Sequence, residues 1–168
     1  MDTRQPNSRY CFVCGVSNPI GLHLHFNQTA PGEITVEVIL PEQYQGYPGI
    51  VHGGIIAAML DEVAGRVHMG SSDQPRFMFT ARLDVRYRKN VPTETPLRVV
   101  GTAGESKGRM AEAKAAIYNM DGELLADATA VLVDVPDRVM QDVNLESVGW
   151  RIYPENQIGT PAAPAPGM

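Results

Sequence analysis

The chain lacks several features that would place it in a special class. It contains no apolar run of about 18 residues, the length that a membrane-spanning helix needs. Its first residues are polar and lack the apolar core of a secretory signal peptide. Basic residues are not in excess, because the formal net charge is -5, and this argues against a nucleic-acid partner. We therefore expect a cytoplasmic protein without membrane or nucleic-acid partners, whose two cysteines stay reduced.

What the chain does contain is typical of one folded domain. Apolar residues make up 43% of the 168 residues and charged residues 20%, which suits a single globular core. The pattern divides the chain into a lead-in at 1–32, a domain at 33–135 and an extension at 136–168. Proline and glycine punctuate the lead-in, where only Leu22–Phe26 is predicted to be extended. The extension is anchored by Trp150 and Tyr153, and its low-complexity end, Gly159–Met168, is predicted to be disordered.

Within the domain, the hydrophobic period distinguishes one helix from several strands. Apolar residues recur at three- and four-residue steps from Gly53 to about Met69, which predicts a helix. Alternation of apolar and polar residues predicts strands at 33–40, 77–88, 97–105, 110–118 and 124–135. The Asp121-Gly122 pair is a hairpin signal between the last two strands. We predict an α+β fold in which a five-stranded antiparallel sheet, its last four strands a meander, packs on one long central helix.

The most informative motif lies where this helix begins. His52-Gly53-Gly54 places free backbone N–H groups at the helix N-terminus, a site suited to the negative charge of a carbonyl under attack. Asp61 follows nine residues after His52 and supplies a carboxylate for use as base or nucleophile. Nine helical residues span about 13.5 Å and turn through about 900°, so Asp61 lies on the opposite face. If both groups serve one reaction, they come from two chains of a dimer; otherwise Asp61 is simply the exposed side of an amphipathic helix.

Several further motifs accompany these residues at characteristic spacings. They are Cys14-Gly15, Asn18-Pro19, Gly21-Leu22, the stretch Tyr44–Gly54, Asp61, Thr80–Leu83 and Tyr87-Arg88. Together with the order of elements, they resemble the hotdog-fold acyl-CoA thioesterases, in which a curved antiparallel sheet wraps a central helix. The resemblance is strongest to the subgroup of phenylacetate-pathway thioesterases and mammalian thioesterase-superfamily proteins, and it extends over residues 11–135.

The resemblance implies a role for each matching residue. Gly53 and Gly54, with His52 ordering the turn, bind the thioester carbonyl oxygen, while Asp61 of the neighbouring subunit activates water or attacks the carbonyl. Thr80 helps to place the water. Strict alternation puts its side chain on the face opposite Phe79 and Ala81, away from the helix, so this role requires either a bulge that redirects it or a neighbouring subunit that meets its face. The family also implies a homodimer or a dimer of dimers, and no cofactor besides the coenzyme A of the acyl-CoA substrate.

Other residues of the family pattern concern substrate binding. Some relatives carry an asparagine six residues before the histidine, where this chain has Gly46, and the adjacent Gln45 is a candidate for a similar role. Arg88 and Lys89 are candidates for contacts with the phosphates of coenzyme A. The alternative is that these two cations belong to a solvated strand face.

The Cys11-Phe-Val-Cys14 motif has three possible interpretations. One cysteine pair cannot fill a tetrahedral zinc site, although His23 and His25 lie close by in the sequence. A redox motif would begin a helix after a strand, and neither element is predicted here. We favour structural packing and expect no metal.

Two rival functions remain open from the sequence. Hydration or dehydration of an acyl thioester on the same fold would require a catalytic histidine paired with an acid. A non-catalytic module that binds or senses acyl-CoA would use the same pocket without turnover, because a fold alone does not determine function. The acyl-CoA thioesterase is the function that we favour.

Overall fold

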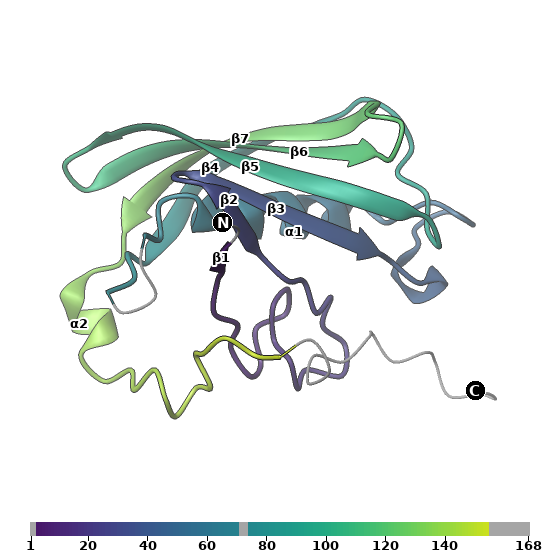
Figure 1. Cartoon of the computed structure of the whole chain (residues 1–168). Coiled ribbons are helices and arrows are strands. Elements are labelled where there is room, and N and C mark those ends of the chain that lie inside the picture. The colour runs from purple at the N-terminus through teal and green to yellow at the C-terminus, as the bar shows by residue number, and fades with distance from the viewer. Residues whose placement is uncertain (1–2, 71–73, 155–168) are drawn as a thin grey trace.

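A computed structural model describes residues 3–70 and 74–154 of the chain (Figure 1). The predicted disorder at Gly159–Met168 lies outside the described residues. The strands are β1 (Thr3–Arg4), β2 (Asn27–Ala30), β3 (Glu33–Ile39), β4 (Met78–Tyr87), β5 (Pro96–Lys107), β6 (Met110–Asn119) and β7 (Leu124–Asp134). The helices are α1 (Gly53–Arg66), α2 (Asp137–Met140) and a 3-10 turn at Glu42–Tyr44. None of the described helices is long and apolar enough to cross a membrane.

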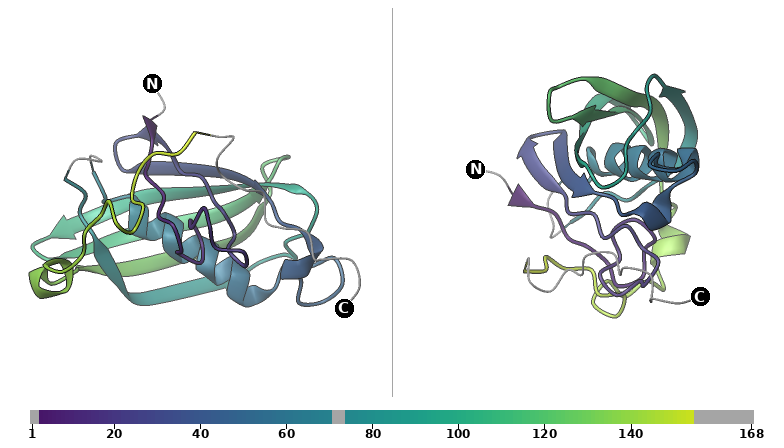
Figure 2. Two further views of the ribbon diagram at one scale, coloured as in Figure 1. Left: turned by 90° about the horizontal axis from the view of Figure 1, so that it is seen from below. Right: turned by 90° about the vertical axis from the view of Figure 1, so that its right-hand side faces the viewer.

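The strands form one antiparallel sheet in the order β1-β2-β3-β5-β6-β7-β4. The sheet curves around α1, as the end-on view in Figure 2 shows. This arrangement confirms the α+β class with one central helix, but the details differ from the prediction. The sheet has seven strands rather than five, and α1 has 14 residues and ends at Arg66, short of the predicted Met69.

The predicted position of β4 in the sheet was wrong, and the extended piece predicted at Leu22–Phe26 forms no strand. β4 pairs with β7 and not with β5, so only β5, β6 and β7 form a meander, and β4 lies at the far edge of the sheet. Leu22–Phe26 is not a strand, because the extended pairing with β3 begins only at Asn27. Leu22, Leu24 and Phe26 are nevertheless fully buried, so their apolar pattern reflects packing rather than sheet pairing.

Close packing of α1 on the sheet depends on small residues. The helix buries Ile56, Met59, Leu60 and Val63 toward the sheet. The facing strands present the buried alanines Ala111, Ala113, Ala115, Ala126, Ala128 and Ala130. A Cβ added at Gly101 of β5 would lie 2.6 Å from Cγ1 of Val63, so the helix and β5 approach as closely as only glycine permits. The alanine and glycine positions therefore determine how closely α1 packs against the sheet.

A β-bulge changes which side chains of β4 face the helix. The pairing of β4 with β7 shifts register between Thr80 and Arg82, so Ala81 is the extra residue. Met78 and Thr80 consequently lie on the same side as Leu83 and Val85, next to α1. The prediction that Phe79 faces the helix was wrong, since its side chain is 50% exposed.

The lead-in and the C-terminal extension cover the side of α1 that the sheet leaves open (Figures 1 and 2). The Arg66 guanidinium at the end of α1 lies 3.7 Å from the centre of the Phe26 ring and 5.4 Å from that of Trp150. Its Nη1 donates to the carbonyl oxygen of Pro6 at 2.8 Å. Trp150 also packs edge-on against Phe77, and Tyr153 is buried, as predicted for two anchors of the extension. Arg66 thus holds both terminal segments against the helix.

Candidate active site

The N-terminus of α1 is closed by its own histidine. His52 is the N-cap, and its Nδ1 accepts a hydrogen bond from the N–H of Gly54 at 2.9 Å. The N–H of Gly53 has no hydrogen-bond partner within residues 3–70 and 74–154. The Tyr87 hydroxyl at the end of β4 donates to the Gly53 carbonyl oxygen at 2.9 Å and so fixes the first helical residue. The amide available to an incoming carbonyl oxygen is therefore that of Gly53, while that of Gly54 serves the cap.

The second half of α1 carries a carboxylate with an ordered donor. The Thr80 hydroxyl donates to Oδ1 of Asp61 at 2.6 Å. The bulge at Ala81 makes this contact possible, because it turns Thr80 toward the helix. Oδ2 of Asp61 has no partner among the described residues and is free to bind water. The structure thus brings together Asp61 and Thr80, although strict alternation along the strand would have placed the Thr80 side chain away from the helix.

Asp61 and Thr80 open onto a cavity of about 210 Å³. The lead-in, the second half of α1, the start of β4 and the extension all contribute to its wall. Its other lining residues are Ser8, Cys11, Cys14, Glu62, Gly65, Arg66, Met69, Arg76, Phe77, Met78 and Trp150. The cavity lining combines two acids and two arginines with apolar and sulfur-containing side chains.

The two halves of the predicted site do not meet within one chain. Gly53 and Asp61 are separated by more than two turns of α1, which corresponds to about 12 Å along the helix axis. A single carbonyl group cannot contact an amide and a carboxylate so far apart. A site that uses both therefore requires Gly53 from one copy of the chain and Asp61 from another, and the shared site stays a prediction.

The loop before the helix uses Gln45 for its own structure. The Gln45 side-chain oxygen accepts from the N–H of Gly49 at 3.0 Å, and its nitrogen donates to Glu42 at 3.4 Å. Gly46 instead faces the histidine, since a Cβ added there would lie 3.4 Å from Cδ2 of His52. Position 46 therefore has room for a side chain beside His52, and the substrate role predicted for Gln45 stays untested.

Both cations predicted to bind coenzyme A are paired with acids. Arg88 forms a bidentate contact with Asp127 of β7, and Lys89 contacts Glu123 in the turn between β6 and β7. The neighbouring Asp127 carboxylate raises the pKa of Arg88 through a hydrogen bond and its charge. Arg88 and Lys89 are exposed, so a phosphate must compete with these two acids for them.

Comparison with known proteins places this geometry in a family. Residues 48–126, which include His52, Gly53, Gly54, Asp61, Thr80 and Arg88, match the model of the thioesterase superfamily. The solved structure of a thioesterase superfamily protein has a TM-score of 0.68 at 29% identity, over 75% of this chain and 61% of that one. The matched segment thus has the sequence pattern of the thioesterase superfamily, and the fold resembles that of a solved thioesterase superfamily protein.

Two further comparisons show how much of each chain the likeness covers. The acyl-coenzyme A thioesterase THEM4 of Rattus norvegicus is 31% identical over 96 residues, 56% of this chain. This chain spans only 40% of the length of that relative. The structure of smu.793 from Streptococcus mutans, bound to acetyl CoA, has a TM-score of 0.60 at 18% identity, over 67% of this chain and 88% of that one. The thioesterase-superfamily match leaves out the lead-in, where the cysteines lie.

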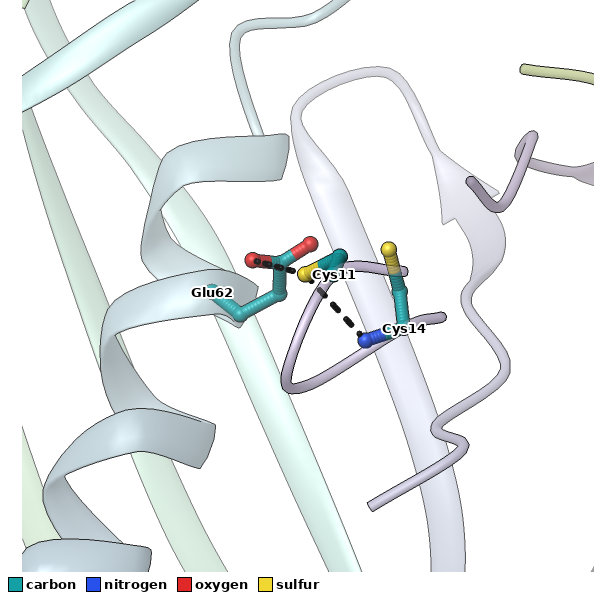
Figure 3. A group of neighbouring side chains, drawn as sticks. All are labelled: Cys11, Cys14 and Glu62. Atoms are coloured by element: carbon teal, nitrogen blue, oxygen red, sulfur yellow. Dashed lines mark hydrogen bonds between the residues drawn. The ribbon is translucent and has the colours of Figure 1, made fainter. Parts of the chain in front are cut away.

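The two cysteines of the lead-in face α1 and not the histidines. Sγ of Cys11 lies 3.9 Å from Oε2 of Glu62, and no histidine joins the cluster within the described part of the chain (Figure 3). His23 instead contacts the carbonyl oxygen of Asn18 at 2.6 Å. A hydrogen bond from Cys14, stronger than the opposing effect of burial, lowers the pKa of the Cys11 thiol to about 7. The same hydrogen bond, together with burial, raises the pKa of Cys14.

Sequence reasoning assigned no role to three residues around the site, although Tyr87 was part of the family pattern. Glu62 was not singled out because it follows Asp61 on an amphipathic helix, where one more acid is unremarkable in a sequence. Arg66 and Tyr87 were likewise without a role, and their contacts join segments far apart in the chain. Only the spacing of Glu62 and Arg66, an acid and a base four residues apart on the helix, gave a sequence signal.

Proposed function

We propose that the chain hydrolyses acyl-CoA thioesters at a site shared between two copies of itself. The observation that carries the proposal is the Thr80–Asp61 hydrogen bond of 2.6 Å at the mouth of a cavity, on a β-bulge that turns the hydroxyl toward the acid. The unpartnered Gly53 amide at the helix N-terminus supplies the complementary group. An ordered carboxylate and an oxyanion donor are the parts that acyl transfer to water needs.

In the proposed reaction, the thioester carbonyl oxygen of the substrate accepts the N–H of Gly53 from one copy. Asp61 of the other copy binds a water through Oδ2, while Thr80 holds Oδ1. The water attacks the carbonyl carbon and gives a proton to Asp61, and the helix N-terminus stabilises the resulting oxyanion. Collapse of the tetrahedral intermediate breaks the carbon–sulfur bond, and the proton on Asp61 passes to the departing thiolate of coenzyme A.

Direct attack by Asp61 is the second route to the same products. It forms a mixed anhydride with release of coenzyme A, and water then hydrolyses the anhydride. A single turnover in ¹⁸O-labelled water, followed by mass spectrometry of the peptide that contains Asp61, detects the second route when water attacks the aspartyl carbon of the anhydride. Attack by Asp61 with hydrolysis at the aspartyl carbon leaves the label in the protein, whereas general-base catalysis places it only in the acid product.

The proposed substrate class is supported by the relatives. The rat relative is named an acyl-coenzyme A thioesterase, and the Streptococcus mutans structure is described as bound to acetyl CoA. Arg88 and Lys89 lie immediately after β4, whose last residue, Tyr87, contacts Gly53. They are therefore near the helix N-terminus, where coenzyme A phosphates would gather if the thioester lies at Gly53.

The test is release of free thiol from short, long and aromatic acyl-CoAs by the wild type and by Asp61→Asn. We expect Asp61→Asn to lower kcat by about 10²–10⁴-fold, the usual contribution of a general base. Asp84→Asn is the matched control, because Asp84 is an exposed carboxylate on β4, the strand that carries Thr80, and is paired with Arg82 at 3.1 Å. Absence of turnover on every acyl-CoA, with the protein folded and dimeric, would overturn the proposal in favour of a non-catalytic acyl-CoA binding module.

The geometry supports hydration or dehydration less well. That chemistry requires a histidine that exchanges protons with the substrate, and Nδ1 of His52 is engaged by the Gly54 amide. With Nδ1 as acceptor, a neutral His52 carries its proton on Nε2 and stabilises the turn. Incubation of an enoyl-CoA with the wild type and detection of a hydroxyacyl-CoA would favour this alternative over hydrolysis.

A further inference from the structure

In the turn that begins at Cys11, two backbone N–H groups donate to the Cys11 sulfur. Sγ of Cys11 accepts the N–H groups of Val13 at 3.3 Å and of Cys14 at 3.4 Å. The N–H of Gly15 closes the turn on the Cys11 carbonyl oxygen at 2.9 Å. A Cβ at position 15 would lie only 2.3 Å from that oxygen, so the turn requires glycine. Hydrogen bonds to sulfur of this kind favour the thiolate and orient it as a ligand.

Glu62 completes a group of three ligand atoms from two distant segments. The two sulfurs and a Glu62 carboxylate oxygen lie within 4.8 Å of one another (Figure 3). Oε1 of Glu62 accepts from Nε of Arg66 at 2.9 Å, which directs Oε2 toward Cys11. The carboxylate is thus oriented by one oxygen and offers the other to the cysteines. Arg66 is itself held at 3% side-chain exposure by its contacts with the lead-in.

We propose that Cys11, Cys14 and Glu62 bind one Zn²⁺ ion that fastens the lead-in to α1 beside Asp61. Zinc accepts thiolate sulfur at about 2.3 Å and carboxylate oxygen at about 2.0–2.2 Å in a tetrahedral arrangement. Two thiolates select zinc over magnesium or calcium, which prefer oxygen ligands alone. On binding, the two thiols release their protons to solvent, and the ion together with Arg66 balances the three negative charges.

All three proposed ligands line the cavity that holds Asp61 and Thr80, so the fourth ligand of the zinc would come from this cavity. A water would complete the tetrahedron there. The ion's role is to hold the wall formed by Ser8 and the CxxC turn at a fixed distance from Asp61. The site departs from the expectation that the cysteines only pack, and it stands independently of whether the chain hydrolyses thioesters.

The first test is titration of reduced, metal-free, tag-free chain with Co²⁺, followed by displacement with Zn²⁺. We expect one equivalent of Co²⁺ to produce an intense thiolate-to-cobalt absorption, which Zn²⁺ abolishes. Because the sequence contains only two cysteines, that absorption has a single possible origin. Absence of the absorption while two free thiols per chain are titrated would overturn the proposal. This measurement needs no variant and no substrate.

Variants then test the ligand set by competition with a chromophoric chelator. We expect Cys14→Ser to weaken zinc binding by at least about 100-fold, and Glu62→Gln by about 10–100-fold with the thiolate absorption retained. Asp61→Asn is the matched control, since Asp61 is the adjacent acid on the same cavity but is not in the cluster; it should keep the zinc affinity within threefold, whatever its turnover. Equal losses in Glu62→Gln and Asp61→Asn would show that Glu62 is not a ligand. Zinc should also raise the melting temperature of the wild type and not of Cys11→Ser.

Discussion

The two ends of α1 show two ways of building half a site. At the N-terminus, His52, Gly53 and Gly54 are consecutive, and the cap hydrogen bond spans two residues. In the second half, Asp61 depends on Thr80 from β4 and shares its cavity with the lead-in and the extension. The cap of the first half is a local structure of three consecutive residues, to which Tyr87 of β4 adds one contact from outside. The second exists only when segments distant in sequence are folded together, so mutations should affect the two halves differently.

The largest expected difference comes from removing the Gly53 amide. Gly53 is the first helical residue, where proline is tolerated, and His52 has the extended backbone (ψ 137°) that a following proline requires. Gly53→Pro therefore removes the N–H without breaking the helix, and we expect kcat to fall by about 10²–10³-fold. Gly53→Ala fills the same space beside Tyr87 but keeps the N–H, and its kcat should stay within about threefold of wild type. Equal losses in both variants would mean that space, and not the amide, is what the site needs.

A mixed dimer tests whether the two halves come from different copies. Gly53→Pro and Asp61→Asn are each inactive alone, but a dimer of one with the other contains one site with both groups intact. Random mixing of the two chains should therefore restore about a quarter of wild-type activity, because half of the dimers carry one working site. The measurement is thiol release after the two variants are coexpressed with different tags; the mixed dimer, once isolated through both tags, should show about half of wild-type activity. Recovery no higher than the sum of the two variants would exclude a shared site.

A smaller effect is expected from the contact that orders Asp61. Thr80→Val removes the hydroxyl that donates to Oδ1 and keeps the branched shape that suits a strand. We expect kcat to fall about tenfold, the value of one hydrogen bond to a charged acceptor, with little change in melting temperature. Thr102→Val, an exposed threonine on β5, is the control and should leave kcat unchanged. An unchanged kcat in Thr80→Val would leave Asp61 without an ordering partner in the reaction.

The same comparison explains how much the sequence could predict. The helix from Gly53, the strand alternation and the His-Gly-Gly turn were all predictable, because each is set by the neighbours of a residue in the chain. The bulge at Ala81 was not predicted. One extra residue moves every later side chain of the strand to the opposite face of the sheet, but the alternation of apolar and polar residues in the sequence continues through Ala81 without a break. The pairing of β4 with β7 was missed because adjacent strands in the sequence were assumed to be neighbours in the sheet. Glu62 acquires partners only when the lead-in folds onto α1.

The smallest expected effect concerns Arg88 and Lys89, the cations after β4. Their acidic partners Asp127 and Glu123 compete with the substrate phosphates for them. Arg88 is already bound by Asp127 through two contacts, so its loss removes a phosphate partner that was only partly available. We expect Arg88→Gln to raise KM for acyl-CoA by about two- to fivefold without changing kcat, because exposed ion pairs contribute little. Asp127→Asn should act in the opposite direction and lower KM, since it frees the guanidinium. Both shifts should shrink as salt concentration rises. Opposite signs at these two positions would assign Arg88 to coenzyme A, whereas an unchanged KM in both variants would leave Arg88 as a structural link between β4 and β7.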